Sequence, residues 1–518
     1  MREALRRVTS CVLWLWRAHL IPPVFCGVVY LLTLAPGVYG YDSAELATGA
    51  YTLGIVHPTG YPLYLLLGKL FTLLPVGSIA YRVNLMSAFF AALTVWLVAR
   101  LAVRWIRSPL IAGLAATTLG LTPAFWSLAV VAEVYTLHTF LLAANLTLAL
   151  QWRRERKALW LGLLALVSGL SLTNHVSSAM YIPGLVLLCI GDGRGQRLRR
   201  WLPALGLLFL AGLSLYAYLP IRDAATPGIN YVRQFYNVNL QSLSGLWWMV
   251  SGQAYRFFVF AYGLKAYLIE VWISLVSLWH NLTGLGLGLA MLGALVQWRA
   301  NRHVMLATAW IMLSTLLFFA GYAVADKLTM ILPAYLVLVL WMAVGARRLQ
   351  TWAGQMPSSQ FGRQVGRTLS PAVPAMMALM LVLMTALNWG RLDKSNAHGA
   401  EVFARQALSG VSEGALMVSQ WSPAVTLEYF QQVEGLRTDV SVFNRSRFEV
   451  AVYYEYWRRG IDHSAVLRTI TQLEREAIAE MARGRTVYGT EFDPMLANEY
   501  EYLPAGAVFQ MIPRKPDT

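Results

Sequence analysis

Long runs of apolar residues constrain this chain more than any other feature of its sequence. They approach or reach the ~17 to 25 residues that an α-helix needs to cross the hydrocarbon core of a bilayer. A water-soluble fold built from such runs would have too little polar surface to cover itself. We therefore predict an α-helical polytopic membrane protein of about eleven transmembrane helices, over residues 20–38, 84–103, 110–129, 134–151, 158–172, 177–191, 202–219, 271–296, 305–324, 329–344 and 371–388.

Composition supports this class and excludes others. Only 13% of the residues are charged, against roughly 25% in soluble domains. The formal net charge of +16 would suggest nucleic acid in a soluble protein, but the basic residues form short clusters between apolar runs. Membrane topology explains such clusters, so no nucleic-acid partner is expected. The three cysteines have neither metal-ligand nor disulfide-framework spacing, so we expect no zinc site and no disulfide scaffold.

The basic clusters also predict the orientation, because Lys and Arg concentrate in cytoplasmic loops. Arg2, Arg6 and Arg7 precede the first run, which we interpret as a retained span, and further clusters follow every second run. An odd number of spans then places the amino terminus in the cytoplasm and the carboxy terminus outside it, in a cell inner or plasma membrane. We predict a membrane domain over residues 1–388, with outer loops at 39–83 and 220–270.

Residues 389–518 have the composition of a soluble protein. Helical patterns at 397–408, 423–433 and 464–481 alternate with strand-like runs at 415–419, 440–443, 486–490 and 507–512. This alternation predicts a small extracytoplasmic α/β domain. It has no Gly-rich phosphate loop, nucleophile elbow or HExxH motif, so we interpret it as an accessory domain.

The first outer loop contains the most informative polar residues. It is too apolar for a solvated loop, and we expect one or two helices along the membrane surface, broken at residues 57–62. Asp42 follows the first span directly, and Glu45 lies three residues later, on the same helical face. An Asp-x-x-Glu pair often only caps a helix. The functional alternative is a base held in a low-dielectric cleft.

A resemblance favours the functional alternative. Residues 42–84 read DSAELATGAYTLGIVHPTGYPLYLLLGKLFTLLPVGSIAYRVN. This stretch closely resembles the opening signature of the membrane family catalogued as domain of unknown function 2723. That family includes a transmembrane protein O-mannosyltransferase and belongs with the GT-C glycosyltransferases. The resemblance continues more weakly through YLPIRDAATP at 218–227, WWMVSGQAYR at 247–256 and residues 427–440.

The resemblance implies a GT-C-like fold and a reaction. GT-C enzymes use lipid-phosphate sugars, and a carboxylate just after their first span lies at the catalytic centre. Asp42 is the matching residue here. It would accept the proton of an acceptor hydroxyl that attacks the anomeric carbon, and a single displacement would invert that carbon. Glu45 would orient Asp42, contact the acceptor or cap the helix.

A polyprenyl-phosphate leaving group requires positive charge at the outer surface. Arg82, Arg222, Arg256 and Lys327 face outward against the positive-inside trend, and Arg222 is the first choice. The alternative is that these cations reach lipid headgroups or pair locally, as Arg222 with Asp223 and Lys327 with Asp326. His57 and Tyr61, in the HPTGYP stretch, are further predicted contacts of the donor phosphate or sugar.

A weaker set of polar residues lies at or within the spans. Ionisable groups at membrane depth are costly and suggest a cavity, although helix–helix hydrogen bonds explain them equally well. The members are Glu133, His138, His175 and Asp326. Asp42 and Glu45 could also hold a divalent cation, but two carboxylates are too few to predict a metal site.

Three function classes remain open from the sequence. The leading one is an enzyme that transfers a sugar, such as mannose, from a polyprenyl-phosphate donor to a hydroxyl of a protein or glycan outside the cytoplasm. A transporter or flippase of a lipid-linked sugar would suit the many spans, but we see no paired repeats or interrupted helices. A receptor or assembly factor would depend on the carboxy-terminal domain instead of Asp42.

Overall fold

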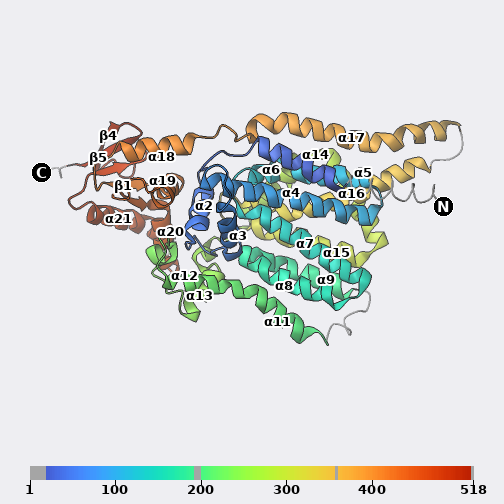
Figure 1. Ribbon diagram of the computed structural model, residues 1–518, viewed down its shortest axis with the longest axis horizontal. Helices are drawn as coiled ribbons and strands as arrows, with labels where there is room; N and C mark the ends of the chain where they lie inside the picture. The colour runs from blue at the N-terminus through green and yellow to red at the C-terminus, as the bar shows by residue number, and fades with distance from the viewer. Residues whose placement is uncertain (1–18, 192–199, 356–359, 462, 515–518) are drawn as a thin grey trace.

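The computed structural model describes residues 19–191, 200–355, 360–461 and 463–514. The arginines before the first span, on which the predicted orientation partly depends, lie outside these ranges. Helices fill most of the molecule, and the β-sheet lies at one end with helices α18 to α21 (Figure 1). The amino-terminal helices and the carboxy-terminal helices meet at α2.

Six helical segments in the described ranges are long and apolar enough to cross a membrane, and a bent pair makes a seventh. The bent pair is α5 (Pro109–Leu121) with α6 (Pro123–Ala129), which meet at an angle of 67°. Pro123 ends α5, because proline cannot donate the next helical hydrogen bond. The six are α4 (Ile79–Ile106), Leu202–Ala224, α14 (Leu264–Ala300), α15 (Arg302–Ala320), Lys327–Gly354 and Thr368–Leu392.

The prediction of an integral membrane protein is confirmed, whereas the count of eleven spans is not. Several predicted spans coincide with apolar helices that are too short, namely His19–Leu32, α8 (Ala158–Asn174) and Val176–Ile190. The predicted span 134–151 coincides with α7 (Val134–Glu155), which is not among the six. Apolar length alone does not separate a full span from a short buried helix.

The first outer loop forms two helices with a break between them, as predicted. These are α2 (Asp42–Thr52) and α3 (Pro62–Thr72). Proline at the first position starts α3, where its fixed φ suits a helix and its missing N–H costs nothing. The intervening chain pairs with the second outer loop, because the Ile55 N–H donates to the Ile229 carbonyl and the Tyr231 N–H donates to the Ile55 carbonyl.

The remaining elements of the membrane part connect or extend these helices. They are η1 (Val176–Tyr181), α9 (Ile182–Ile190), α11 (Leu202–Leu213), η2 (Ser214–Ala217), α12 (Tyr218–Ala224), the π turn η3 (Val232–Tyr236), α13 (Leu243–Val250), η4 (Gln253–Phe258), η5 (Lys327–Thr329), α16 (Leu332–Gly354) and α17 (Gln360–Leu392). Helix α16 is buried along most of its length and packs against α14, α15, α17, α5, α4 and α7. It therefore forms the core of the helical bundle.

The carboxy-terminal region, residues 399–513, combines helices with a five-stranded sheet of order β2-β1-β3-β5-β4. Strand β1 (Leu416–Ser419) is parallel to β2 (Ser441–Asn444) and β3 (Val487–Gly489), whereas β5 (Val508–Pro513) is antiparallel to β3 and β4 (Tyr500–Ala505). The helices are α18 (Gly399–Ser409), α19 (Trp421–Glu434), α20 (Arg445–Arg458) and α21 (His463–Met481). The sequence predicted all but α20 and β4.

Candidate active site

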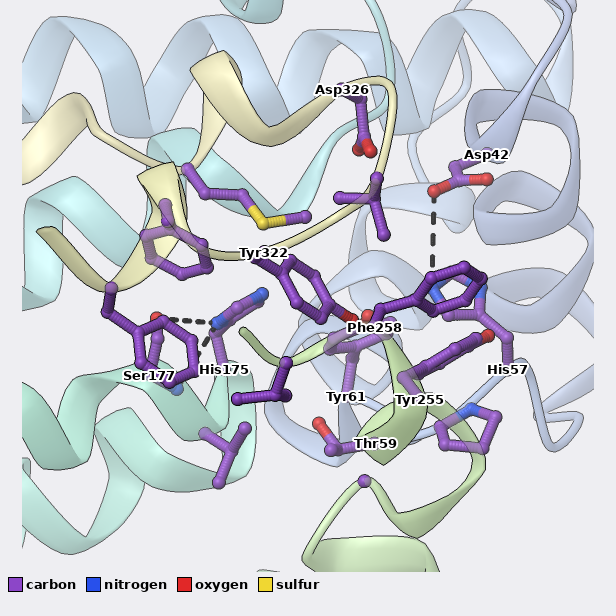
Figure 2. A pocket seen from close by; sticks show the side chains of 18 of the residues that line it. Asp42, His57, Thr59, Tyr61, His175, Ser177, Tyr255, Phe258, Tyr322 and Asp326 are labelled. Atoms are coloured by element: carbon purple, nitrogen blue, oxygen red, sulfur yellow. Dashed lines mark hydrogen bonds and ion pairs between the residues drawn. The ribbon is translucent and has the colours of Figure 1, made fainter. Parts of the chain in front are cut away.

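A cavity of about 470 Å³ lies where the first outer loop, the ends of the membrane helices and the carboxy-terminal region meet (Figure 2). It is large enough for a sugar-sized ligand. Five residues predicted from the sequence line it, namely Asp42, His57, Tyr61, His175 and Asp326. Trp421, Ser446 and Arg447 of the carboxy-terminal region also line it. Two distant parts of the chain therefore share one site.

Asp42 is the first residue of α2, and its carboxylate faces the cavity (Figure 2). The N-cap position is occupied by Tyr41, and Asp42 and Glu45 are the acidic residues of the first turn. One oxygen, Oδ1, accepts a hydrogen bond of 2.9 Å from the indole Nε1 of Trp421. The other, Oδ2, lies 4.0 Å from Nε2 of His57. With a third of its side chain exposed, Asp42 remains open to a ligand.

Glu45 lies one helical turn further along α2 and is fully buried behind His57. Its Oε1 accepts the His57 backbone N–H at 2.7 Å, and its Oε2 lies 2.5 Å from His57 Nδ1. The opposite nitrogen of the ring, Nε2, lies 2.9 Å from the Tyr61 hydroxyl. Glu45 therefore fixes the imidazole so that its other edge faces Asp42 and Tyr61.

Burial opposes charge on both members of this pair, but their attraction outweighs it. For Glu45, burial alone raises the pKa, and the nearby charges of His57 and Arg447 together with the His57 hydrogen bonds hold the pKa below its ordinary value. For His57, burial lowers the pKa, and the carboxylates of Glu45 and Asp42 raise it above its ordinary value. Both shifts favour the charged forms of the pair, an imidazolium and a carboxylate.

Arg447 brings a second buried cation to the site, from the first turn of α20. One guanidinium nitrogen lies 3.5 Å from Glu45 Oε2, and another donates to the Tyr255 hydroxyl at 2.9 Å. The guanidinium lies 3.6 Å from the centre of the Trp421 ring, a cation–π contact. Among the described residues, Arg447 is the single Arg or Lys that lines the cavity.

Asp326 also lines the cavity (Figure 2), and Glu133 lies within electrostatic reach of it. Burial and the Asp42 charge raise the pKa of Asp326, and burial with Asp42 and Asp326 raises the pKa of Glu133 well above its ordinary value. Three carboxyl groups in one apolar site do not all ionise together. Burial and the Asp42 charge therefore both favour the protonated forms of Asp326 and Glu133.

The predicted histidines of the membrane part form a second polar cluster next to the cavity. His175 Nδ1 lies 2.7 Å from the Ser177 hydroxyl, which in turn lies 3.3 Å from His138 Nε2. The His175 ring stacks on Tyr61, with centroids 5.9 Å apart. Burial and the nearby His57 charge lower the pKa of His175 to about 4. His175 is hence neutral at physiological pH, whereas His138 is buried behind it.

Two predicted phosphate contacts, Arg82 and Arg222, are outside the cavity lining. Arg222 donates to the carbonyls of Leu53 at 2.6 Å and Thr52 at 3.3 Å, where α2 ends. Arg82 donates in the same way to three carbonyls around the end of α3. Both cations satisfy helix carboxyl ends, which attract positive charge.

The other two predicted cations are also outside the lining. Lys327 pairs with Glu270 at 2.8 Å and donates to the Tyr262 hydroxyl at 3.0 Å, and Arg256 is exposed. The two local pairings considered from the sequence do not form, because Asp223 pairs with Arg233 and Lys327 pairs with Glu270. The four predicted cations are therefore not brought together, whereas Asp42, Glu45, His57 and Tyr61 are.

Asp42, Glu45 and His57 are also the group that could hold a metal ion, since one ligand atom from each lies within 4.8 Å of the others. Their chemistry fits a metal poorly. Both Glu45 oxygens already accept from His57, and Arg447 places a positive charge beside them. A divalent cation would have to break the Glu45–His57 pair and overcome repulsion from Arg447.

Trp421 and Arg447 are the residues that sequence reasoning missed. Each follows closely after one of two parallel strands, Trp421 after β1 and Arg447 after β2. In open sheets with parallel strands, ligands bind beyond the carboxyl ends of the strands. That rule, applied to the predicted strands at 415–419 and 440–443, would have pointed to these residues.

The fold is shared with known membrane glycosyltransferases. The crystal structure of ArnT from Cupriavidus metallidurans in the apo state matches 98% of this chain and 98% of that one, with a TM-score of 0.56 and 12% identity. The structure of ArnT bound to undecaprenyl phosphate covers 95% of this chain and 97% of that one, with a TM-score of 0.55 and 12% identity. The archaeal oligosaccharyltransferase AglB from Archaeoglobus fulgidus covers 96% of this chain and 74% of that one, with a TM-score of 0.50 and 9% identity. This chain is an integral membrane protein with a GT-C fold.

Sequence comparisons give the particular relatives. Residues 42–197 match the family model of the protein O-mannosyl-transferase TMEM260 N-terminal domain. The mouse protein O-mannosyl-transferase TMEM260 is 35% identical over 212 residues, 38% of this chain and 29% of that protein. Its Dictyostelium discoideum counterpart is 21% identical over 560 residues, 95% of this chain and 66% of that protein. The resemblance predicted from the sequence is thus confirmed, and the chain spans less than two thirds of each relative.

Proposed function

We propose that this protein is an inverting membrane glycosyltransferase. It transfers a sugar, most simply mannose, from a polyprenyl-phosphate donor to a hydroxyl of a protein or glycan on the extracytoplasmic side. The observation that carries the proposal is Asp42, a part-exposed carboxylate at a sugar-sized cavity, whose Oδ2 lies 4.0 Å from His57 Nε2. The names of the relatives and the GT-C fold support the same reaction class.

The reaction needs one base. The acceptor hydroxyl transfers its proton to Asp42 while its oxygen attacks the anomeric carbon from the face opposite the phosphate. The bond between that carbon and the phosphate oxygen breaks, and its electron pair leaves with the polyprenyl phosphate. Because a single displacement occurs, the configuration at the anomeric carbon inverts. Glu45 takes no proton in this scheme, since it is bonded to His57 and buried.

The leaving phosphate gains negative charge as the bond breaks, and cations at the cavity stabilise it. Arg447 and the imidazolium of His57 both line the cavity and are fixed before any ligand binds. Fixed charges of this kind stabilise a transition state without reorganisation during the reaction. In this proposal Arg447 takes the role that the sequence suggested for Arg222.

The test is a transfer assay with the full chain reconstituted in liposomes. The donor is a short-chain polyprenyl-phosphate mannose, and the acceptor is a mixture of exported proteins from cells lacking the gene. We expect mannose on protein or glycan hydroxyls, detected by mass spectrometry, and a loss of about 10³-fold for Asp42→Asn. The matched control is Asp393→Asn, which changes a carboxylate with little burial that is bonded to Ser395.

Two results would contradict the proposal. One is full transfer activity in an Asp42→Asn variant that inserts into the membrane and has the same unfolding temperature as the wild-type protein. The other is movement of the intact lipid-linked sugar across the liposome without a covalent product, which would identify a flippase.

A further inference from the structure

Helix α19 of the carboxy-terminal region lies directly against α2, and hydrogen bonds fix it to the starts of α2 and α4. The N–H of Tyr41, just before α2, donates to the Ser422 hydroxyl at 2.9 Å, and the N–H of Ala80, in the first turn of α4, donates to the Tyr429 hydroxyl at 3.1 Å. A Cβ atom at Gly40 would collide with the Ser422 hydroxyl. The first turn of α19 therefore has a defined position relative to Asp42.

Trp421 opens α19, and its surroundings determine how the indole points. Its backbone N–H donates to the Ser446 hydroxyl at 3.0 Å, and that hydroxyl donates to the Gln420 side chain at 2.6 Å. One face of the ring carries the Arg447 guanidinium at 3.6 Å. With its backbone and one face held, the indole presents its single N–H to Asp42 at 2.9 Å.

This bond makes the two oxygens of the Asp42 carboxylate different. Oδ1 is occupied by the indole N–H, whereas Oδ2 lies 4.0 Å from His57, at the cavity. We propose that Trp421 is a positioning residue for Asp42: its indole N–H holds Oδ1 and leaves Oδ2 to receive the acceptor proton. The inference rests on the proposed function, and it gives the carboxy-terminal region a direct part in the reaction.

The test is Trp421→Phe in the full-length protein, with short-chain polyprenyl-phosphate mannose as donor and a synthetic threonine peptide as acceptor. We expect kcat to fall about tenfold with KM for the donor changed less than about twofold, because the base is misaligned and the donor contacts remain.

Trp248→Phe is the matched control. Trp248 also lies at the junction with the carboxy-terminal region, and its indole donates to the Tyr454 hydroxyl at 2.7 Å, away from the cavity lining. This variant should keep the wild-type kcat and the wild-type KM for the donor. A second variant, with benzothienylalanine at position 421, keeps the bicyclic shape and replaces the N–H by sulfur. It should show the same fall in kcat as Trp421→Phe. It therefore provides the test if the phenylalanine variant folds poorly.

An infrared measurement separates this proposal from the proposed function. The carboxylate stretching bands that disappear in Asp42→Asn report the hydrogen bonding of this group without any substrate. We expect these bands to shift in the benzothienylalanine variant, because no indole N–H then binds Oδ1, and to stay in place in Trp248→Phe. Unchanged bands in the benzothienylalanine variant would overturn the role of Trp421, even if the wild-type protein transfers mannose. Shifted bands without transfer by the wild-type protein would uphold it and overturn the transferase instead.

Discussion

Arg445 and Arg447 are two residues apart at the start of α20, and both guanidiniums are buried. Their surroundings differ. Arg445 binds Glu474 through two nitrogens and Asp493 through a third, at a pocket of about 10 Å³. Arg447 lies beside Glu45, Tyr255 and the Trp421 ring, at the cavity of about 470 Å³.

The comparison separates two uses of the same side chain. A space of about 10 Å³ holds at most one water molecule, so the carboxylates around Arg445 can only compensate that charge and hold the sheet to its helices. Arg447 has a more distant carboxylate partner and a face toward space that a ligand could fill. We therefore assign Arg445 to the fold and Arg447 to the site, and four experiments can break or sharpen this assignment.

The largest effect is expected from Arg445→Ala. It leaves Glu474 buried without a cation, and removing one partner of a buried ion pair typically costs about 3–5 kcal/mol. Pulse proteolysis of the full-length protein should show this loss in the free energy of unfolding of the carboxy-terminal region. Activity per folded molecule should stay near wild type. A stable variant that had lost transfer would place Arg445 in the site as well.

Arg447→Lys should have the opposite effect, a large loss of activity with little loss of stability. Lysine keeps the charge but cannot reach Glu45 and Tyr255 with a planar fork while it stacks on Trp421. We expect kcat to fall about 10- to 100-fold, or about 1.4–2.7 kcal/mol, with a smaller change in unfolding than for Arg445→Ala. Arg458→Lys, in an exposed pair with Glu455 on the same helix, should match wild type. Unaltered transfer by the Arg447 variant would refute its assignment to the site.

The pair of His57 with Glu45 predicts how stability depends on pH. The pKa of His57 lies above its ordinary value of 6.5 in the folded protein. The stabilisation is therefore fully present below that ordinary value and is lost as the pH rises through the folded value. The difference in unfolding free energy between wild type and a Glu45→Gln, His57→Gln double variant should shrink by roughly 1 kcal/mol from about pH 6 to about pH 9. A difference that grew with pH would contradict this charge state.

The smallest effect is expected from metal removal. Charges near Glu45 already compensate one another, so the proposed reaction requires no divalent cation. Treatment with a chelator, followed by dialysis, should leave the transfer rate within about twofold of the untreated protein. A complete loss that magnesium or manganese restored would instead show that Asp42, Glu45 and His57 bind a metal.

Part of the site was predictable because it is local in the sequence. Asp42 and Glu45 share a helical face, and His57 and Tyr61 follow in one short loop whose proline starts the next helix. Local periodicity and turn residues report such arrangements directly. The same reasoning predicted most helices and strands of the carboxy-terminal region.

The rest depended on contacts between distant segments. Charge and topology predict Arg222 as a phosphate contact, yet its guanidinium donates to the carbonyls at the end of α2 instead of lining the cavity. The approach of α19 to α2 has no local signature, so Trp421 and Arg447 were assigned only to an accessory domain. The predicted number of spans differs for a related reason, because a short helix such as α8 is as apolar as a full span.

The bond between Trp421 and Asp42 joins residues 379 positions apart in the chain, and this separation has a consequence for biosynthesis. At ribosomal speeds of ~5–20 residues per second, roughly 20 to 80 s pass between the synthesis of the two residues. During that interval the amino-terminal helices enter the membrane with an unfinished site. If Trp421 positions Asp42 as proposed, the newly made protein therefore stays inactive until α19 has been translated and has folded onto α2.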